Sequence, residues 1–563
     1  MSYHIYKNGV ELNIELQANE ISSGGQGRIY RIDAPNSLNG YCVKLYKDEH
    51  HASANKEKIA YMVCNKPANA NMSNIRICWP EYIVYDSKGS FCGYAMLLAF
   101  EGSRDLKIIE IFSIGKSIAE KYPKYPEWHN KYELDSPTGF LNRLKMLHNW
   151  ALATEIIHGT GKYVIVDLKP DNVLATADGK ISIVDTDSFQ ITDGNKNFPG
   201  PVATPEYFAK FAKERHAQKL NQTCDCDCFA LAISFYKILI GAHPYSGFKL
   251  LPPYDGDEYS DIASRIDAEL FVFGKNKSFI ELLKKNNMHE RFSKLPPSLQ
   301  SLFMHAFTQR LQPSASSWRQ TLKSIIEPGS RVRVPKIPND INSYTNSEMR
   351  CLCVLVIDVS GSMRLCQNAL NSSLKSFMSD LLHGRNGFKE YSKEQVELAV
   401  IQFDSAVEVL RTPSLIKRGD FIPQLKVRGL KTNTTCALRQ AMKVVGEQKN
   451  KYKLKGLSYY RPWIILLTDG NPNPYCKEDV ESLIVDVNRG IDERKFMFTA
   501  IGIGTEVDKN FLNSISKGNY SYISRKYISE FFQTLSASMS LSDGVNPQEE
   551  LIGTLNSSID VDI

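Results

Sequence analysis

The residues best suited to carry out chemistry lie in one short stretch, Val166–Asn172, with the sequence VDLKPDN. Asp167 could accept a proton, Lys169 could neutralise a phosphoryl group, and Asn172 could hold a metal ion. Asp185, which begins an Asp-Thr-Asp tripeptide, adds a second metal ligand. These groups are what phosphoryl transfer needs, because charge develops on oxygen in its transition state and positioned cations stabilise that charge.

A Gly-rich turn near the N-terminus could serve the same chemistry. Gly24, Gly25 and Gly27 lie between two strand-like segments, and glycines let a backbone approach phosphates without a side chain in the way. An ordinary hairpin turn is the alternative interpretation. Lys44 follows on the next strand and Glu57 on the next helix, so a Lys–Glu ion pair could aim the ammonium at the α- and β-phosphates of ATP.

A second group of oxygen-bearing side chains lies far downstream. The motif DVSGS begins at Asp358 and carries Ser360 and Ser362, Thr432 precedes a helix-like run, and Asp469 follows an apolar strand. Ligands of open parallel sheets bind at the carboxyl ends of the strands, and hard oxygen ligands suit Mg²⁺. A DxSxS string alone is more often a helix-capping turn.

The order of the elements indicates two folded regions. Residues 1–100 read as short strands with one helix, and residues 141–325 read mostly as helices. Residues 326–349 are rich in Pro, Asn and Ser and predict a linker. From Cys351 onward, strands alternate with helices, which predicts a parallel sheet covered on both faces. The residues from Leu541 lack Lys and Arg and predict a partly disordered acidic tail.

Composition narrows the functional class. The 563 residues are 42% hydrophobic and 23% charged, with a formal charge of +6. No dense basic stripe accompanies this small charge, which argues against nucleic acid as a partner. The longest apolar run, Phe229–Ile240, is shorter than the roughly 20 residues of a membrane helix. No signal peptide is visible, so we expect a cytoplasmic protein that does not bind membranes.

The 12 cysteines fit this compartment, because most lie singly in apolar segments as reduced core thiols do. Cys224, Cys226 and Cys228 are more closely spaced. A zinc site usually needs a second pair of thiols, which this segment lacks. A helix start with buried thiols is therefore the favoured interpretation of these three residues.

The first constellation resembles the protein kinase fold over about residues 10–325. Lys169, two residues after Asp167, resembles the serine/threonine kinases rather than the tyrosine kinases. The segment Thr204-Pro-Glu-Tyr resembles the substrate-side end of an activation segment. By the same resemblance, Asp227 begins the buried central helix and braces the backbone of the catalytic loop.

At closer range this region resembles bacterial kinase-like proteins linked to tellurium-resistance-type von Willebrand factor A (vWA) proteins. The motifs that carry the resemblance are EKI at Glu57, WP at Trp79, GYAM at Gly93 and DTDSFQ at Asp185. It implies that Met96 is the gatekeeper and that the backbone near Leu97 and Leu98 meets adenine.

The second constellation resembles the metal-ion-dependent adhesion site of vWA domains over about residues 350–540. The resemblance implies that Asp358, Ser360, Ser362 and Thr432 are ligands of Mg²⁺, with Asp469 coordinating directly or through water. Such a site leaves one position open for a carboxylate from a partner protein. The acidic tail, through Asp560 or Asp562, is a further candidate for that carboxylate. No activated nucleophile is evident nearby, so binding is expected rather than catalysis.

Three departures from the kinase pattern affect the interpretation. Ile165-Val166 replaces the His-Arg pair before the catalytic Asp, so no Arg can pair with a phosphorylated activation loop. We therefore expect activity that does not require loop phosphorylation, and collapse of activity in a loop-phosphosite mutant would contradict this. Asp187 replaces the Gly of the metal-binding tripeptide, and either adds a carboxylate near the metals or caps a turn. Phe211 and Gln312 replace both halves of a buried Glu–Arg ion pair. Loss of both halves suggests a coherent substitution, because loss of one would strand a buried charge at about 3–5 kcal/mol.

The predicted fold is thus an α+β bilobal protein kinase fold followed by an α/β Rossmann-like vWA domain. The predicted boundaries are a kinase domain at 1–325 with lobes at about 1–100 and 101–325, a linker at 326–349, a vWA domain at 350–540 and a tail at 541–563.

The predicted function is a serine/threonine protein kinase that uses ATP and Mg²⁺, with Mn²⁺ as a possible substitute. Its vWA module would recruit a partner or substrate that presents an acidic residue, and the resemblance implies a stress or tellurium-resistance-type pathway. One alternative is a pseudokinase adaptor that binds nucleotide as a switch. A weaker alternative is a small-molecule kinase, although Thr204-Pro-Glu-Tyr favours a protein substrate.

Overall fold

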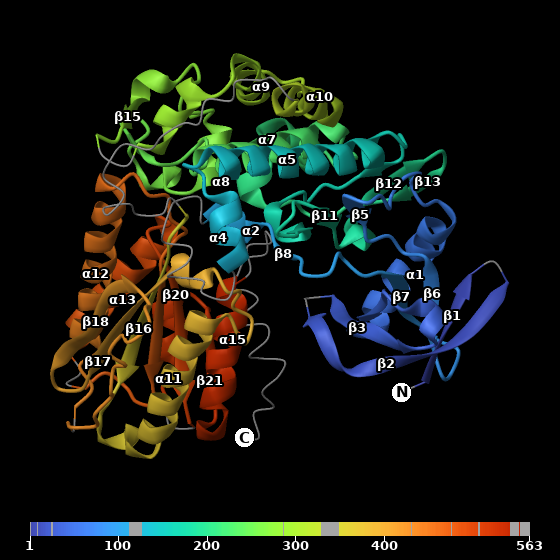
Figure 1. Cartoon of the computed structure of the whole chain (residues 1–563). Coiled ribbons are helices and arrows are strands. Elements are labelled where there is room, and N and C mark those ends of the chain that lie inside the picture. Colours follow the sequence, from blue (N-terminus) through green and yellow to red (C-terminus); the bar gives the residue numbers. More distant parts are fainter. Residues whose placement is uncertain are drawn as a thin grey trace. The chain divides into compact units, whose positions relative to one another are not determined.

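The computed structural model contains two compact units (Figure 1). The first comprises Met1–Pro244 and Met288–Asn342, and the second comprises Tyr245–Asn287 and Ser343–Ile563. The described residues are 2–7, 9–23, 26–111, 126–284, 287–327, 348–429, 431–473, 476–504, 507–540 and 551. The predicted linker therefore lies mostly outside the described residues, as does the predicted acidic tail apart from Leu551. Within the described part, no helix is both long enough and apolar enough to cross a bilayer.

The N-terminal part of the first unit is a closed barrel of six strands in the order β1-β2-β3-β4-β7-β6. The strands are β1 (Ser2–Lys7), β2 (Val10–Ser23), β3 (Gly27–Ala34), β4 (Tyr41–Tyr46), β6 (Tyr82–Asp86) and β7 (Phe91–Leu97). Alternate apolar side chains, among them Ile5, Ile14 and Val43, point to one buried core, as the period of a strand requires. Helix α1 (Glu49–Cys64) begins where the Asp48 side chain accepts the His51 N–H. The predicted short strands and single helix of this region are confirmed, although the sequence pattern gave no bounds for β1 or for the first half of β2.

A small sheet in the first unit brings two predicted site segments together. Its strands, in the order β5-β11-β10-β8, are β5 (Ile75–Ile77), β11 (Ile181–Ile183), β10 (Val173–Ala175) and β8 (Arg104–Asp105). Strands β10 and β11 are antiparallel, so the residue before β10 and the residues after β11 lie at the same end. The Val184 N–H donates to the Asn172 carbonyl at 3.1 Å. This pairing holds Asn172 close to Asp185.

The rest of the first unit is mainly helical. Its α-helices are α2 (Lys107–Ile111), α4 (Pro126–Tyr132), α5 (Pro137–His158), α6 (Lys210–Ala217), α7 (Cys224–Ile240), α9 (Pro297–Thr308) and α10 (Ala315–Ile326). Short strands β9 (Tyr163–Val164), β12 (Gln190–Asp193) and β13 (Lys196–Phe198) form a separate three-stranded sheet. Helix α7 is almost completely buried, and it begins at Cys224 with Cys226 and Cys228 in the core, as the structural interpretation of these cysteines predicts.

Aromatic packing occupies the place of the missing buried ion pair. The Phe211 ring meets the Phe229 ring edge-on at 6.4 Å, and Phe229 meets Phe307 at 6.0 Å. The Gln312 side-chain amide donates to the Gln309 carbonyl at 3.0 Å. The two departures are therefore compatible with a packed core, because neither leaves an unpaired charge behind.

The second unit is built on a six-stranded sheet in the order β18-β17-β16-β19-β20-β21. The strands are β16 (Cys351–Asp358), β17 (Val396–Phe403), β18 (Val407–Leu415), β19 (Trp463–Thr468), β20 (Met497–Ile503) and β21 (Tyr520–Ile523). All neighbours are parallel except β17 and β18. The helices are α11 (Gln367–His383), α12 (Thr434–Leu454), α13 (Lys477–Asp492), α14 (Lys509–Ser516) and α15 (Ile528–Ser540).

Helices cover both faces of this sheet (Figure 1), and successive residues of β16 point to opposite faces. Cys353, Leu355 and Ile357 pack with α11 and α15, whereas Val354 and Val356 pack with α12, α13 and α14. A strand buried on both faces reads as a continuous apolar run, which is what the sequence shows. The predicted strand–helix alternation is confirmed here.

The segment Tyr245–Asn287 folds with the second unit, although the predicted kinase boundary at 325 would include it in the first. It contains β14 (Phe248–Leu250), α8 (Ile262–Asp267) and β15 (Ile280–Leu282). Near the end of α12, the Gly247 N–H donates to the Gly456 carbonyl at 3.2 Å, and the Tyr459 N–H donates to the Ser260 carbonyl at 3.0 Å.

Charge reinforces this contact. Asp257 is paired with both Lys449 and Lys453 of α12, and the Lys453 ion pair measures 2.8 Å. The Tyr459 hydroxyl donates to the same carboxylate at 3.2 Å. Burial raises the pKa of Asp257, but the two lysines outweigh it and hold the pKa below its usual value.

Replacement of Gly456 tests this docking. Gly456 has φ +64°, and a Cβ there would lie 2.9 Å from backbone atoms of Phe248. Gly456→Ala is therefore expected to lower the free energy of unfolding of the second unit by about 1–3 kcal/mol. The matched control is Gly446→Ala, inside α12 with nothing near its Cβ position, which should raise stability by about 0.5–1 kcal/mol. Urea unfolding of the full chain measures both, and equal shifts would contradict the docking.

Candidate active site and metal centre

The catalytic-loop side chains form one hydrogen-bonded group. Asp167 Oδ1 accepts the Thr204 N–H at 2.9 Å and the Thr204 hydroxyl at 2.7 Å. Lys169 Nζ lies 2.9 Å from Asp167 Oδ2 and 2.8 Å from Thr204 Oγ1. Asn172 Nδ2 donates to the Asp167 carbonyl at 2.9 Å. The predicted base, cation and amide ligand are thus gathered at one place, and Thr204 of the Thr-Pro-Glu-Tyr segment joins them.

Asp227 holds the backbone that carries this group. Its carboxylate accepts the N–H groups of Ile165 and Val166, each at 2.8 Å, as the kinase resemblance implies. Val166 has φ +68°, an outlier for a β-branched residue, at a cost of about 1–3 kcal/mol. The bond to Asp227 offsets that strain next to Asp167. His158 Nε2 lies 2.8 Å from Asp227 Oδ2 and is the third partner of this carboxylate.

The turn that carries the predicted metal ligand Asp185 follows β11. Asp185 adopts the left-handed backbone conformation with φ +57°, which Asp tolerates better than most residues. Its side chain is 43% exposed, and its Oδ1 lies 2.8 Å from Lys44 Nζ. Lys44 comes from β4, 141 residues away. With Asn172 adjacent, these residues provide the oxygen ligands and the cation that a magnesium–nucleotide complex requires.

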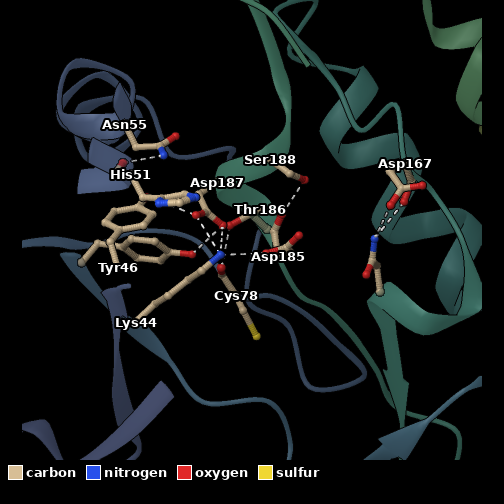
Figure 2. Close-up of polar contacts among 12 residues, drawn as sticks. Lys44, Tyr46, His51, Asn55, Cys78, Asp167, Asp185, Thr186, Asp187 and Ser188 are labelled. Atoms are coloured by element: carbon tan, nitrogen blue, oxygen red, sulfur yellow. Dashed lines mark hydrogen bonds and ion pairs between the residues drawn. The ribbon is translucent and has the colours of Figure 1, made fainter. Parts of the chain in front are cut away.

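The predicted ion pair between Lys44 and Glu57 is not what the structure shows. Glu57 is exposed, and Lys44 Nζ instead lies 2.8 Å from each oxygen of Asp187. Figure 2 shows Lys44, Asp185 and Asp187 in one cluster, with Asp167 apart from it. The prediction failed because one position along a helix rotates a side chain by about 100°, so Lys58 occupies the buried face in place of Glu57.

Asp187 accepts two further hydrogen bonds. The Tyr94 hydroxyl donates to it at 2.9 Å and the Tyr46 hydroxyl at 3.1 Å. Burial raises the pKa of Asp187, but Lys44 and these donors outweigh it and hold the pKa below its usual value. The alternative that Asp187 merely caps a turn is therefore excluded, since its carboxylate is buried among side-chain donors.

The residues predicted to contact the nucleotide lie on β7 and just after it, and their contact with adenine stays a prediction. Met96 is buried on β7, opposite Cys42 of β4. The Leu98 N–H donates to the Gly40 carbonyl at 2.8 Å, and the Leu98 carbonyl accepts from Arg76 at 2.6 Å. Leu98 thus uses both backbone groups in bonds within the protein.

The glycines are only partly described. Gly24 and Gly25 lie outside the described residues. Gly27 is buried at the start of β3, where a Cβ would lie 2.3 Å from the Leu45 carbonyl oxygen. Close approach of two strands therefore accounts for this glycine, and its contact with phosphate remains a prediction.

The segment that the kinase resemblance identifies as the activation segment is short. It runs from Asp185 to Thr204 and contains the β12–β13 hairpin. Thr192 is its one exposed hydroxyl residue between these ends, and Asn221 donates to its Oγ1 at 3.2 Å. The expectation that activity needs no loop phosphorylation stays a prediction. Replacing Thr192 and measuring activity would test it.

The second site lies at the carboxyl ends of β16 and β19. Asp358 Oδ1 accepts the Ser360 N–H at 2.8 Å, and its Oδ2 accepts the Thr468 hydroxyl at 2.6 Å. Ser360 Oγ lies 3.1 Å from Ser362 Oγ, whose hydroxyl donates to Asp469 Oδ1 at 2.8 Å.

Thr432 closes this group from a third loop. Backbone hydrogen bonds of 2.7 and 2.8 Å pair it with Asn473, and its Oγ1 lies 3.8 Å from the Cβ position of Gly470, next to Asp469. Burial raises the pKa of Asp358 to about 6, and Asp469 adds to the rise. Two buried carboxylates among hydroxyls are a donor set that fits a hard divalent cation.

Sequence reasoning missed several residues of the first site. Tyr46 and Tyr94 donate to Asp187, Lys58 faces the same charges, and His158 pairs with Asp227. The one available signal was period 2 along β4, which places Tyr46 on the same face as Lys44. His158 and Tyr94 lie on other elements, so only the fold brings them in.

Comparisons with known proteins also separate the chain into two regions. Residues 353–537 match the family model of the von Willebrand factor type A domain. The N-terminal region is similar to proteins named Protein kinase YegI from Escherichia coli O157:H7, at 25% identity over 313 residues, and from strain K12, at 25% over 320 residues. The alignments cover 53% and 54% of this chain but only 43% and 44% of the relatives, so the chain spans less than half their length.

Other matches are more distant. A Caenorhabditis elegans protein named putative ribosomal protein S6 kinase alpha-1 is 27% identical over 165 residues, covering 28% of this chain and 19% of that protein. A solved structure of the ROP18 kinase domain in complex with AMP-PNP and sucrose covers 58% of this chain and 84% of that chain, at 15% identity and a TM-score of 0.37. That score is too low to argue from. The chain therefore combines a kinase-like region with a von Willebrand factor type A domain, as the sequence predicted.

The ion pair between His158 and Asp227 predicts that stability depends on pH. Burial lowers the pKa of His158, but Asp227 outweighs it and raises the pKa well above its usual value. The pair therefore contributes stability fully below about pH 6.5 and loses it as pH rises through the raised pKa. We expect His158→Gln to cost about 3–5 kcal/mol at pH 6 and less at high pH. Urea unfolding between pH 5 and 10 measures this difference.

The matched control for this titration is His148→Gln on the same helix. Burial lowers the pKa of His148 below its usual value, so His148 costs stability only as pH falls below about 6.5. Both variants should thus differ most from the wild type at low pH but in opposite directions, with His158→Gln less stable and His148→Gln more stable than the wild type there. A His158→Gln effect that grows with pH would contradict the ion pair.

Proposed function

We propose that the first unit is a protein kinase that transfers the γ-phosphate of ATP to serine or threonine hydroxyls of a protein. The second unit is proposed to bind a protein partner through a divalent cation held at Asp358. The observation that carries the proposal is the 2.8 Å contact between Lys44 Nζ and Asp185 Oδ1. It brings a phosphate-binding cation from the barrel to a metal ligand that lies beside Asn172 and the catalytic loop.

The catalytic loop supports a specific division of labour. Asp167 would orient the acceptor hydroxyl and take its proton as the hydroxyl oxygen bonds to the γ-phosphorus. The bond from that phosphorus to the bridging oxygen breaks at the same time, and ADP leaves with the electron pair. Lys169 would neutralise the transferring group. Asn172 and Asp185 would hold a magnesium ion, which would supply charge neutralisation at the phosphate oxygens.

Two features favour serine and threonine in proteins as acceptors. Lys169 follows Asp167 by two residues, and its ammonium is held 2.8 Å from Thr204 Oγ1. This bond fixes Lys169 beside the base Asp167. An aliphatic acceptor hydroxyl would have to lie next to both of them. The segment that begins at Thr204 supports a protein substrate over a small molecule.

The site in the second unit supports binding rather than catalysis. Its oxygen donors are contributed by three loops, and among the described residues none of the side chains in this group is a Cys or a His that could serve as a nucleophile or general acid. A cation held by Asp358 and Asp469 with hydroxyl ligands keeps room for an external carboxylate. We propose an acidic protein segment as the ligand. A stress or tellurium-resistance-type pathway stays a prediction from the sequence resemblance.

Phosphate transfer from labelled ATP tests the first proposal. Asp185→Asn is expected to reduce transfer to the protein itself or to a generic substrate by about 10²–10³-fold, because it removes a metal ligand. The control is Glu15→Gln, which removes one exposed carboxylate from β2 and should leave the rate unchanged. Wild-type protein that binds ATP·Mg²⁺ but transfers no phosphate would favour the nucleotide-binding adaptor instead.

Magnesium-dependent stability tests the second proposal. In an Asp185→Asn background without ATP, Mg²⁺ at about 100 times its dissociation constant should add about 2.7 kcal/mol to the stability of the second unit. Asp358→Asn should remove that increment. Glu447→Gln, on the exposed face of α12, should retain it. Urea unfolding with Mg²⁺ and with chelator gives the increments, and equal values in the Asp358→Asn and Glu447→Gln variants would refute this site.

A further inference from the structure

The Lys–Glu arrangement expected from the sequence is reversed around Lys44. Helix α1 contributes a lysine, and the carboxylate comes from another element. The expected arrangement puts the partner carboxylate on the helix after the lysine strand. Here the helix residue at the expected position, Glu57, is exposed, and the next residue, Lys58, is 7% exposed. The carboxylate comes from Asp187, at the position where the metal-binding tripeptide has Gly in other kinases.

We propose that Asp187 is the positioning carboxylate of Lys44, and that α1 contributes Lys58 as a second cation for the phosphates of ATP. This inference rests on the proposed function, since it assigns roles in ATP binding. It separates the two carboxylates of the tripeptide. Asp185 faces the metal, and Asp187 holds the lysine.

Burial supports the division between the two carboxylates. The Asp187 side chain is 0% exposed and that of Asp185 is 43% exposed, although both lie 2.8 Å from Lys44 Nζ. A metal ion bound to substrate phosphates needs the accessible carboxylate. The enclosed carboxylate has no such access, and its two oxygens are occupied by the ammonium.

The donors of Asp187 show that this arrangement is built into the sheet. Lys44 and Tyr46 are two residues apart on β4 and therefore share a face, and Tyr94 is the register partner of Lys44 on β7. All three direct a donor to the one carboxylate, at 2.8 to 3.1 Å. The position of Lys44 is thus set by the barrel and the turn, with no contribution from Glu57.

Lys58 supplies the other half of the exchange. Its side chain is buried on α1. Burial lowers the pKa of Lys58 to about 8, and the carboxylates of Asp187 and Asp185 oppose that fall. Two lysines therefore accompany two aspartates here. If Asp185 held a metal ion, the Lys58 ammonium would be left to face the added phosphate charge. A buried ammonium needs such a counter-charge, because isolated burial is unfavourable.

Affinity for ATP·Mg²⁺ and for adenosine distinguishes this role from a purely structural one. Lys58→Met removes the charge at nearly constant length and should weaken ATP·Mg²⁺ binding by about tenfold, the equivalent of one charged hydrogen bond. Adenosine, which has no phosphates, should bind as before. Lys58→Arg should restore most of the ATP affinity. The control is Lys56→Met, an exposed lysine on the same helix.

Phosphate transfer tests Asp187. Asp187→Asn should lower kcat by about 10²-fold through a misplaced Lys44, whereas Glu57→Gln should change it less than twofold. The reverse order would restore the helix glutamate as the partner and overturn the proposal. The double variant Asp187→Gly with Lys58→Glu returns the carboxylate to the helix and should recover at least tenfold of the lost kcat. If Asp187→Asn does not fold, the Lys58 variants and the double variant still decide.

The outcomes separate this inference from the function on which it rests. Wild-type protein that neither binds ATP·Mg²⁺ nor transfers phosphate would refute the proposed function. Wild-type protein that does both, alongside Asp187→Asn and Lys58→Met variants that match it, would refute only the charge exchange. Equal losses of ATP and adenosine affinity in Lys58→Met would show that Lys58 is structural and would also refute its proposed role.

Discussion

The constraint on which the structure depends is that a buried carboxylate must be surrounded by donors. Three such groups organise this chain. Asp187 gathers Lys44 and two tyrosines, Asp227 gathers two backbone N–H groups and His158, and Asp358 gathers a backbone N–H and a hydroxyl. An unpaired charge in any of these places would cost several kcal/mol. The donors are therefore fixed in position, and the functional loops that carry them are fixed as well.

The same constraint explains which parts of the site the sequence could predict. Asp167, Lys169 and Asn172 are close in the chain, so their spacing was sufficient to predict the group that they form. Glu57 was different, because its role depended on the face of a helix that the sequence does not fix to within one residue. The partner of Lys44 lies 143 residues away, and only the fold shows that Asp187 is fully buried beside it.

Fold prediction succeeded and failed for related reasons. The sheet of the second unit was predictable because β16 is a continuous apolar run, and doubly buried strands must read that way. The boundary between the units was not, because the segment 245–287 follows α7 in the chain, as kinase order would require. Its assignment rests on ion pairs between Asp257 and two lysines about 190 residues downstream. No local pattern marks such a partnership.

Because the segment 245–287 folds with the second unit, the two units are not consecutive stretches of the chain. The backbone passes between the two units after Pro244, after Asn287 and after Asn342, so three covalent connections join them where one linker was predicted. A fragment that ends at residue 325 would carry Phe248 and Ile262 without the side chains against which they pack, since both belong to the second unit. A fragment that starts at 350 would expose Tyr459 and leave Lys449 without Asp257. The segment 245–287 thus lies within the predicted kinase sequence but folds with the second unit, and Lys449 keeps its carboxylate partner only in a fragment that includes Asp257.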